Sequence, residues 1–215
     1  DGGSDGLTVS NSSGLFNTSA SDWTVQGWYF WPSASPTVVA VLAYGQDSSS
    51  TGRFGIYWAA DNYFYVTDIQ ANNTIMTNTT TMLRNEWVHI AVVNSGGTLT
   101  FYKNGVKVIS ATNTLTSATI TKWYTGYHPG NSWYSVVYFS DVSLTNGALY
   151  TANFYPGLVP LSPTTTIGAS TYVSTLSLNG TSGGVIDYHG TNSVKTIGDV
   201  NLAPEDPYNG SYYSN

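Results

Sequence analysis

A run of aromatic and polar residues between positions 123 and 134 offers the clearest chemistry in this sequence. The run reads W-Y-T-G-Y-H-P-G-N-S-W-Y. Its glycines and proline predict a loop, which is where binding sites usually lie. Aromatic rings pack against the C–H faces of sugars, while Asn and His form hydrogen bonds with hydroxyl groups. The run therefore fits carbohydrate binding, through Trp123, Tyr124, Tyr127, His128, Asn131, Trp133 and Tyr134.

Two other interpretations explain the same run equally well. In one, Trp123 and Trp133 pack beneath the loop while its tyrosines contact a neighbouring subunit. In the other, the whole run serves only local packing. All three interpretations stay open from the sequence alone, because the residue types required by each are the same.

Catalytic residues are harder to find than binding residues. Retaining glycosidases need two carboxyl groups about 5 Å apart, but the only glutamates are Glu86, at the start of a predicted strand, and Glu205, in a proline-flanked tail. The three histidines, His89, His128 and His189, lack the spacing of a metal site. No Gly-x-Ser-x-Gly nucleophile motif occurs. The sequence therefore predicts a protein that is not an enzyme.

Composition and charge exclude several classes of partner. The formal net charge is −6, and no two of the six Lys and Arg residues are adjacent. Binding to nucleic acid or to an anionic membrane surface needs clustered positive charge, so neither partner is expected. No apolar run approaches the length of a membrane-spanning helix, so membrane insertion is not expected. The chain has no cysteine, which excludes disulfides and thiolate metal sites.

The elements that would position the loop are strands. The segment Glu86–Ser110 predicts three consecutive antiparallel strands, with turns at Gly96-Gly97 and at Asn104-Gly105. Apolar residues occupy both faces of the first strand, so we expect it to be buried between two layers. His89 alternates with Trp87 and Ala91 on one of these faces, which favours a packed histidine over a ligand-binding one.

Strand patterns recur at short spacing along most of the chain. Gly27 interrupts one of them and indicates a bulge or a close packing contact. Regular short strands separated by turn residues predict an all-β fold, a two-sheet antiparallel jelly-roll sandwich. The further strands expected are Leu7–Ser10, Trp23–Trp31, Val38–Tyr44, Arg53–Trp58, Tyr63–Asp68, Thr74–Thr77, Ile120–Gly126 and Tyr134–Leu144.

The last quarter of the chain has a different pattern. We place the sandwich in residues 1–163 and a β-rich extension in residues 164–215, joined by a proline-containing connector. We expect a strand at Tyr172–Leu178 and a hairpin formed by Gly184–Tyr188 and Ser193–Ile197. So few apolar residues cannot form a separate core, so the extension should dock on the sandwich or on a neighbouring subunit. The aromatic residues Tyr208, Tyr212 and Tyr213 then predict subunit contacts in a homo-oligomer.

Four segments, taken in order, resemble the motifs of laminin-G-like, concanavalin A-like jelly-roll domains. They are W-T-V-Q-G-W-Y at Trp23–Tyr29, E-W-V-H-I-A-V at Glu86–Val92, T-L-T-F-Y-K-N-G-V at Thr98–Val106, and the segment Phe139–Phe154. The last segment is similar to the form of this domain found in bacteriophage virion proteins. One position departs from that form, because Ser143 stands where an Arg is usual. The resemblance extends from about Gly6 to Pro163.

The resemblance implies a non-catalytic bacteriophage protein exposed on the virion surface, and so extracellular. Its role would be capsid decoration or a similar structural task, through contacts with other virion proteins and with copies of itself. One alternative is a tail-fibre or adhesin module that binds host surface glycans through the aromatic run. Another is a secreted laminin-G-like binding domain. Members of such a family differ widely in function, so the fold alone does not select among these roles.

No cofactor is required by this interpretation, although the resemblance allows a single calcium ion. Laminin-G-like domains often hold Ca²⁺ at a loop rim through carboxylates and carbonyls. The candidate ligands here are Asp47, Asp61 and Asp141. Asp47 precedes a serine run and Asp61 precedes Asn62, which are natural turn positions. We therefore favour turn capping over metal binding for these aspartates.

Overall fold

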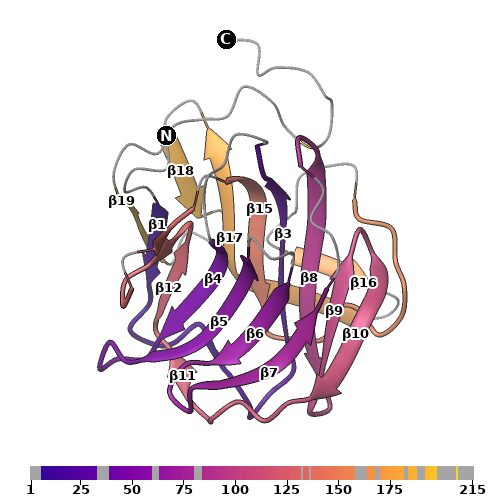
Figure 1. The fold of residues 1–215 in the computed structure, drawn as a ribbon, viewed down its shortest axis with the longest axis horizontal. Helices are drawn as coiled ribbons and strands as arrows, with labels where there is room; N and C mark the ends of the chain where they lie inside the picture. Colours follow the sequence, from indigo (N-terminus) through magenta and orange to yellow (C-terminus); the bar gives the residue numbers. More distant parts are fainter. Residues whose placement is uncertain are drawn as a thin grey trace.

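The computed structural model describes residues 6–32, 39–59, 63–79, 84–131, 133–135, 137–157, 164–167, 170–181, 184–187, 192–197 and 207. The regular elements in these ranges are strands that pair antiparallel, in two main sheets packed face to face (Figure 1). The predicted all-β, two-sheet antiparallel sandwich is confirmed. No helix that could cross a membrane was found among the described residues.

The first sheet runs across the front of Figure 1. In the described part of the chain it has seven strands in the order β19-β1-β12-β4-β5-β6-β7. Hairpins join β4 to β5, β5 to β6 and β6 to β7, whereas β1 is paired with two strands from distant parts of the sequence. The strand bounds are β1 (Gly6–Ser10), β4 (Val39–Gln46), β5 (Gly52–Ala59), β6 (Phe64–Asp68), β7 (Asn73–Asn78), β12 (Lys122–Thr125) and β19 (Ser193–Ile197).

The second sheet lies behind the first. Its described strands follow the order β10-β9-β8-β3-β15-β17-β16, and β18 also pairs with β17. Their bounds are β3 (Trp23–Phe30), β8 (Trp87–Ser95), β9 (Thr98–Lys103), β10 (Val106–Thr112), β15 (Tyr138–Thr145), β16 (Thr164–Ile167), β17 (Ser170–Thr181) and β18 (Gly184–Asp187). Two short pairs complete the set: β2 (Phe16–Asn17) with β11 (Thr119–Ile120), and β13 (Tyr127–His128) with β14 (Trp133–Tyr134).

The core lies between the sheets and is rich in aromatic rings. Phe64 of the first sheet stacks on Phe101 of the second, with ring centroids 3.7 Å apart. Trp23 packs edge-on against Phe54 at 5.5 Å, which again joins one sheet to the other. Such ring pairs contribute about 0.5–1.5 kcal/mol each beyond the area that they bury. Aromatic contacts therefore fix how the two sheets lie on one another.

The strand β8 is buried on both faces, as its sequence predicts. Residues 146–154, which we call the strap, cover the outer face of the second sheet, where Ala91 and Tyr102 pack against the strap residues Tyr150 and Phe154. His89 is 2% exposed on the same face. Its ring contacts Phe154 at a centroid distance of 5.7 Å and Trp28 at 5.2 Å. The prediction of a packed histidine is confirmed.

Gly27 lies beside a local irregularity in the second sheet. A Cβ atom on Gly27 would lie 3.1 Å from Val142 Cγ2. Val142 lies at a break in the register of β15 between Ser140 and Ser143, next to Asp141, which has a φ of 50°. The close contact predicted at Gly27 is therefore present, and it faces a bulge in the neighbouring strand.

The strands expected after position 163 form, but two of them have different partners. β18 pairs with β17 and β19 pairs with β1, so in the described residues they do not form the expected hairpin with each other. The cause is tertiary: β1 presents a free edge to β19, and Val194 packs against the sandwich core. β17 pairs with β15 of the second sheet. Tyr208, Tyr212 and Tyr213 lie outside the described residues.

Candidate functional site

A row of tyrosines crosses the outer face of the first sheet. Tyr124 of β12 lies opposite Tyr44 of β4, and Tyr57 of β5 lies opposite Tyr65 of β6. Successive side chains of a strand point to opposite faces, and the residues next to these tyrosines, such as Ile56, enter the core. The row therefore faces away from the core and forms an aromatic surface on the sheet.

The β13–β14 hairpin lies on this surface. The His128 ring is 4.2 Å from the Tyr44 ring and 5.9 Å from the Tyr57 ring, measured between centroids. Trp133 lies 5.1 Å from His128 and 6.3 Å from Tyr57. A hydrogen bond of 2.7 Å from the Val41 N–H to the Ser135 hydroxyl ties the end of the hairpin to β4. The hairpin is thus held against the sheet by ring contacts and by the backbone.

A cleft of about 310 Å³ opens between this hairpin and strands β5 to β7. Trp133 forms one wall and remains 43% exposed. Small-molecule sites in proteins are typically clefts of roughly 300–1,000 Å³, so the volume suits a small ligand. The lining residues are Tyr57, Ala59, Tyr65, Thr67, Asp68, Ile69, Asn72, Asn73, Thr74, His128, Asn131 and Trp133.

Tyr57 lines the cleft, and its ring lies over Gly55. A Cβ atom on Gly55 would overlap the Tyr57 ring and hydroxyl, so the tyrosine can lie flat only because residue 55 is glycine. The buried Tyr57 hydroxyl has no hydrogen-bond partner, and neither has the Thr67 hydroxyl. Burial raises the Tyr57 pKa far above its ordinary value, and the neighbouring Tyr44 acts in the same direction. Thr67 acts in the opposite direction, although the two hydroxyl groups do not reach hydrogen-bond geometry.

His128 holds the turn that carries Asn131. Its Nδ1 accepts hydrogen bonds of 3.1 Å from the backbone N–H groups of Gly130 and Asn131. An Nδ1 that accepts two hydrogen bonds is unprotonated, which places the proton of the neutral ring on Nε2. Burial also lowers the pKa of His128. At neutral pH the cleft therefore contains an uncharged imidazole with one N–H donor.

The opposite rim is the turn between β6 and β7. Asn72 has a φ of 49°, a conformation that Asn tolerates better than most residues, and its N–H donates to the Ile69 carbonyl at 3.3 Å. This turn places the side chains of Asn72, Asn73 and Thr74 on the exposed rim. The cleft is thus bordered by amide and hydroxyl groups that can both donate and accept hydrogen bonds.

Asp68 lies at the base of the same turn and is fully buried. Its Oδ1 accepts a hydrogen bond from the Ala71 N–H at 2.9 Å, and its Oδ2 accepts one from the Thr116 N–H at 2.6 Å. Burial opposes ionisation, but these backbone donors outweigh it and lower the Asp68 pKa. The carboxylate is therefore charged and already engaged by the protein.

The residues of the aromatic run that we expected to bind a ligand divide into those that line the cleft, those that lie beside it, and Trp123, which is buried in the core. His128, Asn131 and Trp133 line the cleft. Beside it lie Tyr127 and Tyr134, whose rings stack at 4.8 Å, and Tyr124, whose ring is 6.0 Å from that of Tyr127.

Trp123 does not lie at the cleft. It is fully buried in the core between the sheets, and its Nε1–H donates to the Thr125 hydroxyl at 3.1 Å. The alternation of β12 explains this, since residues 123 and 125 point inward while Tyr124 points outward. The packing role considered for Trp123 is the one that this position supports.

The remaining lining residues were not expected from the sequence. They come from β5, β6 and the turn to β7, which are distant in sequence from the aromatic run; they include Tyr57, Tyr65, Thr67, Asn72, Asn73 and Thr74. A signal was present in the pattern Gly55-x-Tyr57, where a small residue alternates with an aromatic one on the outward face of a strand.

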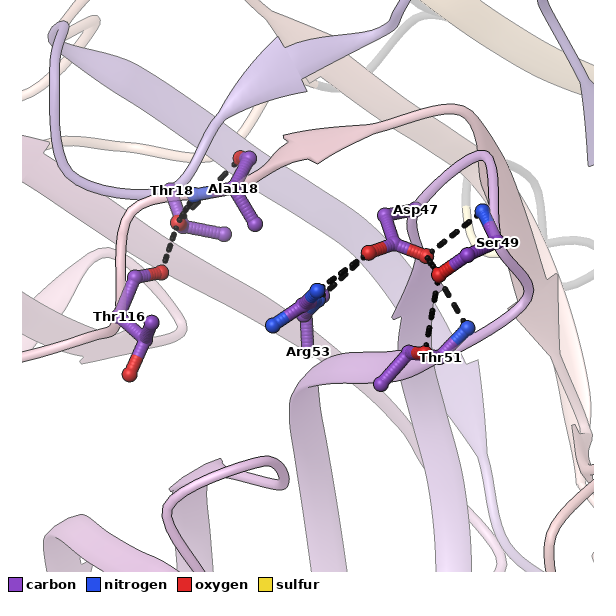
Figure 2. Close-up of polar contacts among 7 residues, drawn as sticks. All are labelled: Thr18, Asp47, Ser49, Thr51, Arg53, Thr116 and Ala118. Carbon is purple, nitrogen blue, oxygen red and sulfur yellow. Dashed lines mark hydrogen bonds and ion pairs between the residues drawn. The ribbon is translucent and has the colours of Figure 1, made fainter.

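The calcium candidates do not come together in the described structure. Figure 2 shows Asp47 closing the β4–β5 turn: its Oδ1 accepts hydrogen bonds from the Ser49 N–H at 2.9 Å and the Thr51 N–H at 3.0 Å, and its Oδ2 binds Arg53 Nε at 2.8 Å. Asp141 is 1% exposed and accepts a hydrogen bond from the Ser140 hydroxyl. Asp61 lies outside the described residues. Nowhere in the described ranges do three or more His, Cys, Asp or Glu residues form a potential metal site.

Comparison with known families identifies the fold. Residues 1–153 match the concanavalin A-like lectin/glucanases superfamily. The chain belongs to this superfamily. The match covers strands β1 to β15 and ends inside the strap, so that strands β16 to β19 of the two main sheets lie beyond it. A search of curated protein sequences found no match.

Solved structures with the same concanavalin A-like fold include a candidate carbohydrate binding protein from Bacteroides ovatus. It has a TM-score of 0.63 and 15% sequence identity, over 90% of this chain and 58% of that one. This chain thus spans a little over half of the Bacteroides protein. The native heptameric SAP-like pentraxin from Limulus polyphemus has a TM-score of 0.50 and 17% identity, over 68% of this chain and 72% of the pentraxin. At such identities the likeness concerns the fold.

Proposed function

We propose that this protein is a non-catalytic carbohydrate-binding module whose ligand occupies the cleft between the β13–β14 hairpin and strands β5 to β7. One observation carries the proposal: the partly exposed ring of Trp133 lines the same cleft as Tyr57 and the amide side chains of asparagines on its rim. A sugar ring has apolar C–H faces and polar hydroxyl edges. The cleft offers a matching surface for each.

Some of the lining residues would stack on the sugar, and others would form hydrogen bonds with it. Trp133 provides the ring on which a C–H face of the sugar packs. The amides of Asn72, Asn73 and Asn131 each donate and accept, which matches hydroxyl groups that do the same. The Nε2–H of His128 adds a donor close to the tryptophan.

A binding role fits the cleft better than hydrolysis. Glycosidases pair a proton-donating carboxyl group with a second carboxylate. Asp68, the acidic residue among the described lining residues, accepts two backbone N–H hydrogen bonds, and its pKa is lowered rather than raised. A carboxylate in this state is a poor proton donor at neutral pH.

A surface role on a bacteriophage virion, as a capsid decoration protein or tail-fibre module, is the second candidate. It is supported by the strap, which is formed by the segment that resembles virion proteins. The strap ends beside two exposed apolar side chains, Tyr155 at 99% exposure and Val106 at 56%. Exposed apolar groups of this kind are available to a protein partner. A virion position and glycan binding are compatible, because neither Tyr155 nor Val106 lines the cleft.

The proposal is tested by screening the protein on a glycan array and measuring affinity for the best ligand by calorimetry. The Trp133→Ala variant should bind about tenfold or more weakly, because the stacking surface is lost. Its melting temperature should fall only slightly, because 43% of the Trp133 surface is already exposed. Tyr155→Ala is the matched control, since it removes an exposed aromatic ring that directly follows the strap and does not line the cleft. Absence of any glycan ligand, or equal affinity in the Trp133 variant, would refute the proposal.

The proposed position on a virion is tested separately, by electron microscopy of purified bacteriophage particles labelled with an antibody against this chain. Label on the capsid shell supports decoration. Label at the tail supports an adhesin, and unlabelled particles exclude both virion roles.

A further inference from the structure

We infer that the cleft is selective for uncharged sugars and discriminates against acidic ones such as uronic and sialic acids. This inference rests on the proposed function and concerns the chemical class of its ligand. It follows from the charges that the structure places in and around the cleft.

The lining residues supply no cation to an acidic ligand. Among the described residues that border the cleft there is neither Lys nor Arg. Arg53 lies on the same strand as Tyr57, but its guanidinium is bound through Nε and Nη2 to Asp47. Lys122, on β12, donates from its Nζ to the Ser50 hydroxyl at 2.6 Å. Cations on neighbouring strands are thus held at the β4–β5 turn.

The histidine in the cleft cannot take the place of a cation at neutral pH. Protonation of His128 at Nδ1 would require it to give up the hydrogen bonds from Gly130 and Asn131. Those two bonds shape the turn that carries Asn131 to the rim. The observed turn of the hairpin therefore requires the neutral form of His128.

The fixed charge at the base of the cleft is negative. Asp68 is ionised beneath the β6–β7 turn, where its oxygens accept hydrogen bonds from backbone N–H groups, among them those of Ala71 and Thr116. The whole chain also has a formal net charge of −6. A carboxylate entering the cleft would lose water without gaining a counterion, which is unfavourable even in a partly open site.

Uncharged sugars meet the opposite situation. Hydroxyl and acetamido groups donate and accept in pairs, as do the amides of Asn72, Asn73 and Asn131. A volume of about 310 Å³ is at the lower end for ligand sites. The cleft therefore fits a single neutral sugar unit, or the end of a short neutral chain.

The test compares sugars that differ only in charge. Methyl glycosides and short oligosaccharides of galactose and glucose are titrated beside the corresponding galacturonates and glucuronates, and lactose beside sialyllactose. Binding is measured by calorimetry and by the NMR shift of the Trp133 indole N–H. We expect at least tenfold tighter binding of the neutral member of each bound pair. Equal or tighter binding of the acidic member would overturn the inference and leave the proposed function intact. Binding of neither class would count against both.

A pair of charge variants separates the local effect from the net charge. Asn73→Lys adds a cation on the rim, whereas Thr98→Lys adds the same charge at an exposed position on the second sheet. At low ionic strength Asn73→Lys should reduce the preference for neutral sugars severalfold, and Thr98→Lys should leave it unchanged. Thermal unfolding confirms that both variants are folded. An equal reduction in both, or no reduction in Asn73→Lys, would contradict a selectivity set inside the cleft.

Discussion

The phenol ring of Tyr57 lies over the backbone of Gly55, two residues earlier on the same strand. A Cβ atom at position 55 would overlap the ring carbons and the hydroxyl. The ring therefore occupies space that a side chain would fill in an ordinary strand. Because Tyr57 also lines the cleft, the glycine helps to set the position of one of the lining rings.

The variant Gly55→Ala should displace the Tyr57 ring. Overpacking of this kind typically costs about 1–3 kcal/mol of stability. The displaced Tyr57 ring should weaken sugar binding as well. Chemical denaturation and calorimetry measure the two effects. In a Tyr57→Ala background the same glycine substitution should be nearly neutral, since the overlapping ring is gone. Equal costs in both backgrounds would show that the ring contact is not the cause.

Stability should fall in mild acid because of His89. Burial lowers the pKa of this residue to about 3, against an ordinary value of 6.5. The unfolded chain therefore binds a proton that the folded chain does not, so stability is fully present above pH 6.5 and decreases as the pH falls toward about 3. The slope contributed by one such proton is at most about 1.4 kcal/mol per pH unit. Urea denaturation at a series of pH values measures it.

The variant His89→Phe isolates this contribution. Phenylalanine keeps the ring between Trp28 and Phe154 and removes Nδ1, which is buried without a partner. We expect stability at pH 7.5 to be equal or higher, and the decrease between pH 6.5 and 4 to be smaller than in the parent protein. An unchanged pH slope would mean that His89 does not carry the linkage.

Asp47 should behave differently with pH. Partial burial raises the pKa of Asp47. Hydrogen bonds from Ser49, Arg53 and Thr51 lower this pKa by a larger amount, so that the net value is about 2. Its contribution is therefore present above about pH 4 and is lost only as the pH falls through about 2.

The variant Asp47→Ala should lower stability by about 1 kcal/mol, by the same amount at pH 5 and pH 8. Arg53→Met, which removes the ion pair and keeps the turn hydrogen bonds, should cost less than Asp47→Ala. Denaturation at both pH values provides the comparison, and a cost that grows between pH 8 and pH 5 would contradict the assignment.

Thr18 joins the β2 region to the segment before β11. Its hydroxyl donates to the Thr116 carbonyl at 2.7 Å and accepts from the Ala118 N–H at 3.0 Å, as drawn in Figure 2. Thr18→Val preserves the shape and leaves the buried Ala118 N–H without an acceptor, which should cost about 1–3 kcal/mol. Thr18→Ser keeps the hydroxyl and should cost less in denaturation experiments. The reverse order would show that the methyl group dominates.

Local patterns in the sequence were enough to predict most of the sandwich. The three strands predicted within Glu86–Ser110 form as β8, β9 and β10, and Asn104-Gly105 forms the expected turn, with φ values of 50° and 76°. Partner choice was less accessible. Whether β19 pairs with β18 or with β1 depends on which edge is open after the sheet assembles, and this information is not present in either segment alone.

The candidate site shows the same division. Trp133 and His128 could be recognised because they lie in one unusual run of residues. Tyr57 and Asn72 could not, because register places them opposite that run from strands far away in the sequence. Trp123 was predicted as a binding residue only because it lies in the same run. The alternation of side chains along β12 places it in the core.

The position of β1 has a consequence for how the chain folds. This strand is the first of the described elements, yet its two sheet neighbours are β12 and β19, which lie far downstream. During synthesis the segment Gly6–Ser10 emerges long before either neighbour exists, and such non-local pairing is associated with slow folding. Until those neighbours are made, its apolar residues Leu7 and Val9 stay unpaired and exposed. We therefore expect the first sheet to be completed late in folding, at a stage when a chaperone can bind the unpaired strand.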